Sequence, residues 1–190
     1  MPRRPDPNVE GRILRAARRL WKKGGEKALT MRAVAKAAGT NTPAVYRRFE
    51  TRQEILRALL RQIQQDFATA IRPAATPEEA CENYLEFALS HAHEYALFYD
   101  HAYRLPAQLQ IVRTPALREQ RPTMALMEGK LAQRLGGAPE DHTRLSLALW
   151  TVAHGTAMIL ISKSIPPEHV PELRSVFTAT VTSMIRNAKV

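Results

Sequence analysis

Residues 29–52, LTMRAVAKAAGTNTPAVYRRFETR, form two short amphipathic segments on either side of Gly39. The apolar residues that recur at helical spacing are Met31, Val34, Ala35 and Ala38 in the first segment and Ala44, Val45 and Phe49 in the second. Glycine adopts a positive φ readily, so Gly39 allows the first helix to end and the chain to reverse. The capping candidates are Thr30 for the first helix and Asn41 or Thr42 for the second, with Pro43 in its first turn. The stretch therefore predicts a helix-turn-helix.

The second of these helices carries the side chains that a DNA-reading helix needs. In a helix-turn-helix the second helix enters the major groove and places its early residues at the base edges. Arginine can form two hydrogen bonds with guanine O6 and N7, and Thr and Tyr hydroxyls can donate to phosphates or bases. The predicted DNA-contacting residues are Thr30, Arg32, Asn41, Thr42, Pro43, Ala44, Tyr46, Arg47, Arg48 and Arg52.

Basic residues are concentrated in the first third of the chain. Residues 1–60 contain 15 Lys and Arg against five Asp and Glu, so their net charge of +10 equals that of the whole chain. A solvated basic face is the simpler interpretation, but an excess confined to a helix-turn-helix pattern is typical of a nucleic-acid-binding surface. Arg3 and Arg4, in a polar and Pro-rich arm, could reach phosphates or belong to an idle tail.

Residues 13–56 resemble the TetR family of bacterial transcriptional regulators. The matching positions are Ile13-Leu14, Ala16-Ala17, Leu20-Trp21, Gly24, Leu29-Thr30-Met31, Val34-Ala35, Ala38-Gly39, Ala44-Val45-Tyr46, Phe49, Arg52 and Glu54-Ile55-Leu56. Trp21, Pro43 and Arg52 stand where Phe, Gly and Lys are more usual. The resemblance implies a domain over residues 1–53 that binds double-stranded DNA. It also implies a helical effector-binding and dimerisation domain over residues 54–190.

Helical periodicity extends over the whole chain without strand-like alternation, repeats or low-complexity runs, so we expect an all-α protein of about nine helices. Thr51 to Glu54 and Thr76 to Glu79 have capping-box spacing. The first of these opens a stiff helix, and a tilt of its far end would move the recognition helix. Besides the helix-turn-helix, the expected helices cover about residues 8–23, 52–71, 77–92, 95–105, 115–136, 139–163 and 171–187.

The resemblance further implies that the second domain binds a small-molecule effector. Residues 150–155, WTVAHG, are similar to the Trp/His/Gly signature of one C-terminal subgroup. Aromatic side chains could gather there into an apolar cavity with a few polar tips, which suits a small, partly hydrophobic ligand. Core packing is the more frequent role for any one of them, and a buried His154 needs a hydrogen-bond partner from either protein or ligand. The predicted set is Phe87, His91, Tyr95, Phe98, Tyr99, Tyr103, Trp150, His154 and Met158.

The last two expected helices carry more apolar surface than a small helical domain buries by itself. Their apolar residues include Leu145, Leu149, Val152, Ile159, Val176, Phe177, Val181, Met184 and Ile185. We therefore expect a two-fold homodimer formed through a four-helix bundle of these helices. Its two recognition helices would lie about 34–36 Å apart, or a multiple of that spacing.

Several sites and locations are disfavoured. Cys81 is the only cysteine, which excludes an intrachain disulfide and favours a reducing compartment and a small buried side chain. The most apolar stretch, residues 145–161, is shorter than the roughly 20 residues that span a bilayer, and the N-terminus lacks a signal-peptide pattern. We expect a cytoplasmic protein without membrane contact. His91 and His93 point to different sides of a helix and no carboxylate or Cys cluster completes a shell, so we expect no metal site. We expect no cofactor.

The main hypothesis is a repressor that a small ligand releases from a palindromic operator. An activator, or a DNA-binding dimer controlled by its abundance or by a protein partner, remains open. An enzyme acting on small molecules is the least supported alternative. The sequence has no readable nucleophile–base pair, metal shell or phosphate-binding glycine loop.

Overall fold

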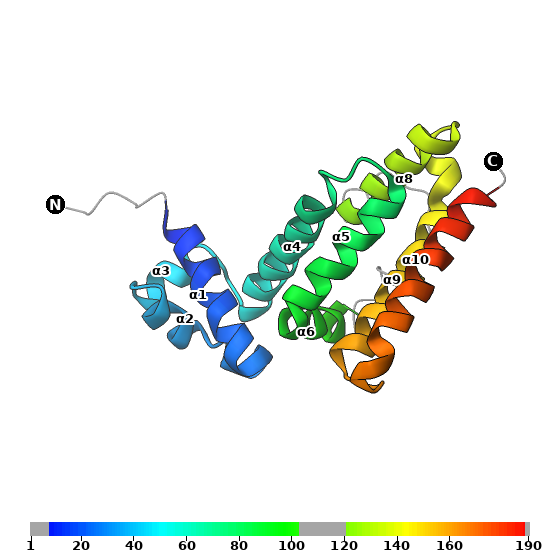
Figure 1. Cartoon of the computed structure of the whole chain (residues 1–190). Coiled ribbons are helices and arrows are strands. Elements are labelled where there is room, and N and C mark those ends of the chain that lie inside the picture. The colour runs from blue at the N-terminus through cyan, green and yellow to red at the C-terminus, as the bar shows by residue number, and fades with distance from the viewer. Residues whose placement is uncertain (1–7, 103–120, 189–190) are drawn as a thin grey trace. The chain divides into compact units, whose positions relative to one another are not determined.

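The computed structural model describes residues 8–102 and 121–188, and these form nine α helices and three short 3-10 helices (Figure 1). The prediction of an all-α fold is confirmed. The chain divides into two compact units, Met1–Ile63 and Gln64–Val190. Helix α4 (Arg52–Ile71) runs from the first unit into the second, so the expected boundary after residue 53 falls within its first turn. That boundary stays a prediction.

The first unit is built around the inward face of α1. Its elements are α1 (Val9–Gly24), η1 (Gly25–Ala28), α2 (Met31–Ala37), α3 (Thr42–Tyr46) and the first three turns of α4. Helix α1 is strongly amphipathic and ends at the glycine pair that the sequence indicated. The buried side chains include Ile13, Ala16, Ala17 and Trp21 of α1, Val34 of α2, Val45 of α3 and Ile55 and Leu59 of α4.

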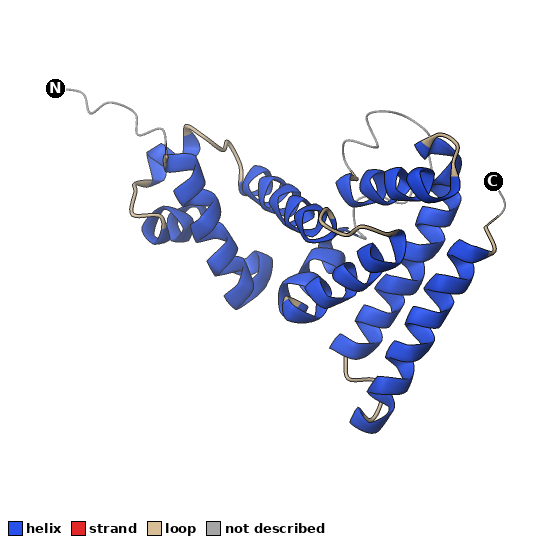
Figure 2. Cartoon of the chain, turned by 45° about the horizontal axis from the view of Figure 1, so that its top comes forward, coloured by secondary structure: helices blue, strands red, loops and turns tan. Residues whose placement is uncertain are grey.

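The second unit is a bundle in which α9 is the central helix. Its further elements are α5 (Pro77–Ser90), α6 (Ala92–Ala102), α8 (Pro122–Leu135), η3 (Pro139–His142), α9 (Thr143–Ile161), η4 (Pro167–His169) and α10 (Val170–Arg186). Helix α9 contacts α5, α6, α8 and α10. Both views show α9 and α10 side by side and antiparallel (Figures 1 and 2). Leu85, Leu131, Leu149 and Phe177 are buried at these contacts.

Some helix boundaries differ from the expected ones. Helix α5 ends at Ser90 rather than near residue 92, and α6 begins at Ala92 rather than Tyr95. Residues 78–105 contain no Gly or Pro, so nothing in the sequence marks this break. The helix expected from Pro139 begins as the 3-10 turn η3 before α9 starts at Thr143. The expected helix start at Thr114-Pro115 lies outside the described residues, and Leu105 does too.

Residues 139–161 form the one segment of the described chain that could cross a membrane by length and composition. Leu149, Ala153 and Ala157 of this segment are nevertheless buried in the second unit. Only 28% of its most apolar window is buried within one protomer. The segment therefore both forms core and presents apolar surface.

Candidate nucleic-acid interface and effector pocket

The helix-turn-helix is held by local capping groups. Thr30 Oγ1 accepts a hydrogen bond from the Ala33 amide at 3.1 Å at the start of α2. Asn41 Oδ1 accepts one from the Ala44 amide at 2.9 Å at the start of α3, which resolves the choice between Asn41 and Thr42. Gly39 has a φ of +64°. The turn and both helix starts therefore form as the sequence predicted.

Helix α3 has one inward and one outward face. Val45 is buried on the helix, and Phe49 is buried just beyond its end. Tyr46 is 51% exposed, which is unusual for so large an apolar side chain. Of the other predicted contact residues on this segment, Asn41, Pro43, Arg47 and Arg48 are exposed, and Thr42 and Ala44 are partly exposed. The structure thus presents the predicted set on the surface, away from Val45 and Phe49.

Arg52 has a partner inside the first unit. Its Nη2 lies 2.8 Å from Glu26 Oε1, and both side chains are partly buried. Arg52 is one of the predicted DNA-contacting residues, and this ion pair holds its guanidinium between α4 and η1. Arg32, the other predicted contact outside α3, is exposed on α2. The expected capping box is also modified, because Glu54 accepts from the Glu50 amide at 2.7 Å while Thr51 accepts from the Glu54 amide.

The predicted aromatic residues of the second unit form a hydrogen-bonded cluster. The Tyr84 hydroxyl lies 2.6 Å from that of Tyr99 and 3.1 Å from that of Tyr95. The Tyr95 hydroxyl lies 2.6 Å from His154 Nδ1. Trp150 Nε1 donates to the Tyr99 hydroxyl at 3.2 Å, and its ring stacks on that of His154 with 7° between the planes. The protein itself therefore supplies the partner that a buried His154 needs.

Burial lowers the pKa of His154 from its ordinary value, so the ring stays neutral near pH 7. Phe87 stacks on His91 with ring centroids 4.2 Å apart, and Phe98 is buried against Phe67. Met158 is partly buried one turn beyond His154 on α9. Tyr103 lies outside the described residues. These contacts are those of packed core, and the ligand-binding role of the cluster stays a prediction.

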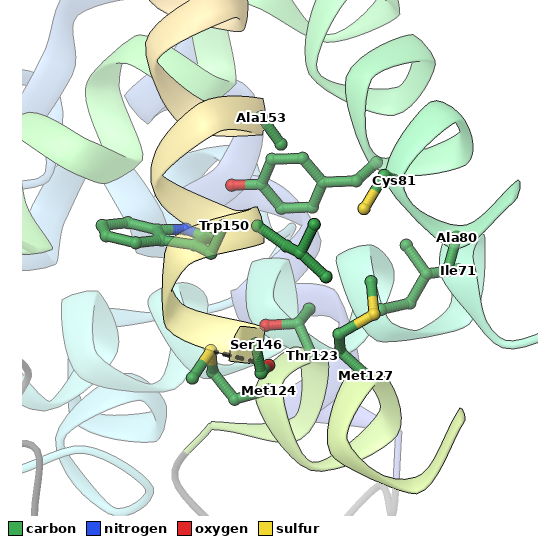
Figure 3. A pocket seen from close by; sticks show the side chains of 11 residues that line it. Ile71, Ala80, Cys81, Thr123, Met124, Met127, Ser146, Trp150 and Ala153 are labelled. Carbon is green, nitrogen blue, oxygen red and sulfur yellow. Dashed lines mark hydrogen bonds between the residues drawn. The ribbon is translucent and has the colours of Figure 1, made fainter. Parts of the chain in front are cut away.

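A pocket of about 30 Å³ lies beside this cluster, between the end of α4 and helices α5, α8 and α9 (Figure 3). Among the described residues its lining contains no charged side chain, and Ser146 Oγ donates to Met124 Sδ at 3.5 Å. Burial raises the pKa of the Cys81 thiol to about 12, and Glu78 and Glu82 add to this, so the thiol is neutral. The lining residues are Ile71, Ala80, Cys81, Tyr84, Thr123, Met124, Met127, Ser146, Leu149, Trp150 and Ala153.

Two family models match the chain. The one described as bacterial regulatory proteins, TetR family, matches residues 13–59 and so includes the whole helix-turn-helix. The one described as tetracyclin repressor-like, C-terminal domain, matches residues 78–184, more than half of the chain. The chain belongs to the TetR family of transcriptional regulators. The narrower assignment to the Trp/His/Gly subgroup stays a prediction.

Solved structures with the same fold cover nearly the whole of this TetR-family chain. SCO4313, a protein described as regulatory, is 22% identical with a TM-score of 0.70, over 97% of this chain and 98% of that one. The multidrug binding protein EbrR, complexed with ethidium, is 23% identical with a TM-score of 0.64, over 94% and 99%. A TetR-like transcriptional regulator from Rhodococcus sp. RHA1 is 18% identical with a TM-score of 0.60, over 98% and 100%. No curated protein sequence matches the chain.

The pocket of this TetR-family regulator differs from the predicted ligand set. Of the predicted residues that the structure describes, only Trp150 lines it, whereas Tyr84 connects the pocket to the aromatic cluster by its hydroxyl. Cys81 was expected to be a small buried side chain and Leu149 to belong to a dimer interface, and helical periodicity did not show that α8 would lie opposite them. Within the described ranges, no group of three or more His, Cys, Asp or Glu side chains could hold a metal ion.

Helices α9 and α10 of the TetR-family chain leave apolar side chains uncovered. Ile159 is 37% exposed and Val176 is 55% exposed. Leu145, Val152 and Met184 are partly exposed. The other residues expected in a dimer interface, Leu149, Phe177, Val181 and Ile185, are buried within the protomer. The two helices therefore have one face inside the bundle and a second apolar face on its surface.

Proposed function

We propose that this TetR-family regulator is a homodimeric repressor of a palindromic operator. The observation that carries the proposal is the outward face of α3, where Tyr46, Arg47 and Arg48 are exposed on a segment anchored by buried Val45 and Phe49. That segment belongs to the unit that holds the whole excess of positive charge. Basic and hydrogen-bonding side chains on a helix of this shape suit the major groove.

The proposed dimer uses the uncovered faces of α9 and α10. Isolated surface hydrophobic residues are common, but Val152, Ile159 and Val176 belong to two adjacent helices of one bundle. A second copy related by a two-fold axis would cover these faces with the same faces and complete a four-helix bundle. TetR-family regulators are typically dimers, which supports this arrangement.

The proposed effector is a small, uncharged and mainly apolar compound in the α5–α8–α9 pocket. The described part of the lining offers sulfur, methyl and aromatic groups with a few hydroxyls and no charge to pair with an ionic ligand. Because an apolar cavity that binds benzene measures about 150 Å³, the pocket must open before it admits such a ligand. Met124 and Met127 line it, and unbranched methionine side chains rearrange readily.

Release from DNA is proposed to occur by a shift of population. An effector that binds better to the state whose half-site spacing does not fit DNA lowers operator affinity. Linkage then requires operator DNA to lower effector affinity by the same factor. Effector affinity should be measured with and without saturating operator DNA. Equal affinities would contradict this mechanism.

A dimer without an effector is the second candidate function. It is favoured by the small size of the pocket and by the Tyr95 hydroxyl, which occupies the His154 ring nitrogen that a ligand could otherwise contact. A thermal-shift screen with neutral apolar compounds separates the two candidates. Specific binding raises the melting temperature, and the shift grows with the logarithm of ligand concentration above Kd, whereas an effector-free regulator would show no shift.

The DNA-binding proposal is tested by a gel-shift assay with the DNA that flanks the gene. We expect a specific complex whose affinity falls steeply with salt, because several phosphate contacts release counterions. Absence of a specific complex at physiological salt would contradict the proposal. The same proposal makes the chain a cytoplasmic binding protein and not an enzyme, in keeping with a family of regulators.

A further inference from the structure

The last carbonyl groups of α2 are all bonded, and two of their donors come from α1. The Thr40 amide donates to Ala35 O at 3.0 Å and the Gly39 amide donates to Lys36 O at 3.3 Å. These two bonds, with Gly39 at a positive φ, form the motif that commonly closes a helix. It leaves the carbonyls of Ala37 and Ala38 without partners from the turn itself.

Arginine side chains of α1 supply those two missing partners. Arg19 Nη2 donates to Ala37 O at 3.1 Å, and Arg12 Nε donates to Ala38 O at 3.4 Å. Arg12, Arg15 and Arg19 line one hollow of about 180 Å³ together with Ala37 and Ala38. Positive charge is also favourable there, because the C-terminal end of a helix carries partial negative charge.

The two hydrogen bonds act on the segment that sets the direction of α3. Between Ala38 and the cap Asn41 the chain has only Gly39 and Thr40. Helix α3 has five residues, and so short a helix does not hold its own orientation. Helix α1, in contrast, has 16 residues, and its side chains Ile13, Ala16, Ala17 and Trp21 are fully buried. Bonds from α1 therefore tie the turn to the longest helix that lies wholly within this unit.

We propose that Arg12 and Arg19 are positioning residues for DNA recognition, which fix the turn between α2 and α3 and thereby the orientation of the recognition helix. The proposal rests on the proposed DNA-binding function. It assigns these two α1 arginines to the architecture of the helix-turn-helix and not to the DNA phosphates. Arg15 provides the matched control. It lines the same hollow, yet no hydrogen bond joins it to α2 in the part of the chain that the structure describes.

The first test needs no DNA. Amide hydrogen exchange at Gly39 and Thr40 is measured for the wild type, for Arg12→Gln/Arg19→Gln and for Arg15→Gln. Loss of two hydrogen bonds to charged donors should accelerate exchange at these amides by about tenfold or more in the double variant. Arg15→Gln should leave it within about twofold of wild type, since it breaks no such bond. Unchanged exchange in the double variant would overturn the proposal. Arg19→Lys keeps a charged donor near Ala37 O and should therefore retain part of the protection that the Gln variant loses.

The second test uses a duplex that the wild-type protein selects from a random-sequence library. The double variant should bind it about tenfold more weakly with the same dependence on salt, at a temperature where circular dichroism shows both proteins folded. A phosphate contact would instead lower the slope of log Kd against log salt by about one per arginine, and that result would overturn the positioning role. Affinity equal to wild type would overturn it as well. Failure of the wild type to select any duplex would contradict the proposed function, whereas the exchange result decides the role of the arginines in the turn.

Discussion

Arg47 and Arg48 directly follow α3, and their amides donate to Pro43 O at 3.1 Å and Val45 O at 2.9 Å. Their backbone is therefore fixed while their guanidinium groups remain exposed. This combination suits base recognition, because an arginine that reads guanine must present two donors in a defined direction. Tyr46, exposed beside them, adds a hydroxyl and an aromatic ring at the same surface.

Replacing Arg47 by Ala should weaken operator binding by about 1–3 kcal/mol and relax the preference at one base position, if Arg47 contacts a base edge. Binding of a set of single-base operator variants, measured by fluorescence anisotropy, checks this. Arg61→Ala removes the same charge from an exposed site on α4 and serves as the control. A uniform loss across all operator variants would show instead that Arg47 contacts a phosphate.

His154 should make the second unit less stable in mild acid. Its pKa is lowered by burial in the folded state, so below the ordinary value near 6.5 the unfolded chain binds a proton that the folded chain does not. Stability is then full above about pH 6.5 and falls as the pH decreases through that value. Denaturant unfolding at pH 7.5 and 5.5 should show a larger loss for wild type than for His154→Gln. Equal losses would contradict this role of His154.

The sequence could predict residue roles that depend on near neighbours. Thr30, Asn41 and Thr76 cap helices because their partners lie three residues away. The ion pair of Arg52 with Glu26 joins residues 26 positions apart, and nothing in the local pattern indicates it. The pocket was missed for a similar reason, because Cys81, Met124 and Ser146 come from three different helices.

At the scale of elements, short helices depend on the segments that close them. Helices α2 and α3 have seven and five residues, so their stability comes from caps and from packing of α2 on α1 and of α3 on α2, rather than from helix propensity. Both caps and Gly39 were readable from the sequence. The break between α5 and α6 was not, because it falls at His91 and neither a glycine nor a proline marks it.

Gly39→Ala should destabilise the protein by about 1–2 kcal/mol. An added Cβ at Gly39 would meet no atom within 4 Å, so the cost comes only from the positive φ of 64°. Gly129, inside α8, also has open space around an added Cβ but lies in an ordinary helix. Gly129→Ala should therefore stabilise by up to about 1 kcal/mol. Chemical denaturation followed by circular dichroism measures both, and a stabilising effect of Gly39→Ala would contradict the turn described above.

For the whole molecule, the sequence predicted an all-helical chain with a helix-turn-helix and a helical C-terminal region, and the fold confirms this. The periodicity predicted the helices, and the charge distribution indicated which part of the chain binds nucleic acid. The surfaces that meet another molecule were only partly predictable. Phe177 and Val181 are among the nine residues expected in the dimer interface, yet they are buried inside the protomer. Helical periodicity predicts which residues are apolar on one face, and it does not distinguish the protomer core from an interface.

Val176→Asp should convert the dimer into a monomer and abolish tight operator binding. In the protomer Val176 is 55% exposed, so the folded monomer tolerates the change. In the proposed four-helix bundle the new carboxylate would be buried without a partner, at a cost of several kcal/mol. Ser175→Asp places the same charge about 100° around α10 and serves as the control. Sedimentation velocity gives the oligomeric state, and a dimer of unchanged stability in Val176→Asp would move the interface elsewhere.

The most direct test of the central claim is to sequence the duplexes that the full-length wild-type protein enriches from a random library at physiological salt. Two recognition helices held by a two-fold dimer predict inverted half-sites whose centres lie about 10–10.5 base pairs apart, or a multiple of that spacing. Arg47→Ala should lose the preference at one symmetric pair of positions. Enrichment of no sequence, or of a single unpaired half-site, would contradict the account.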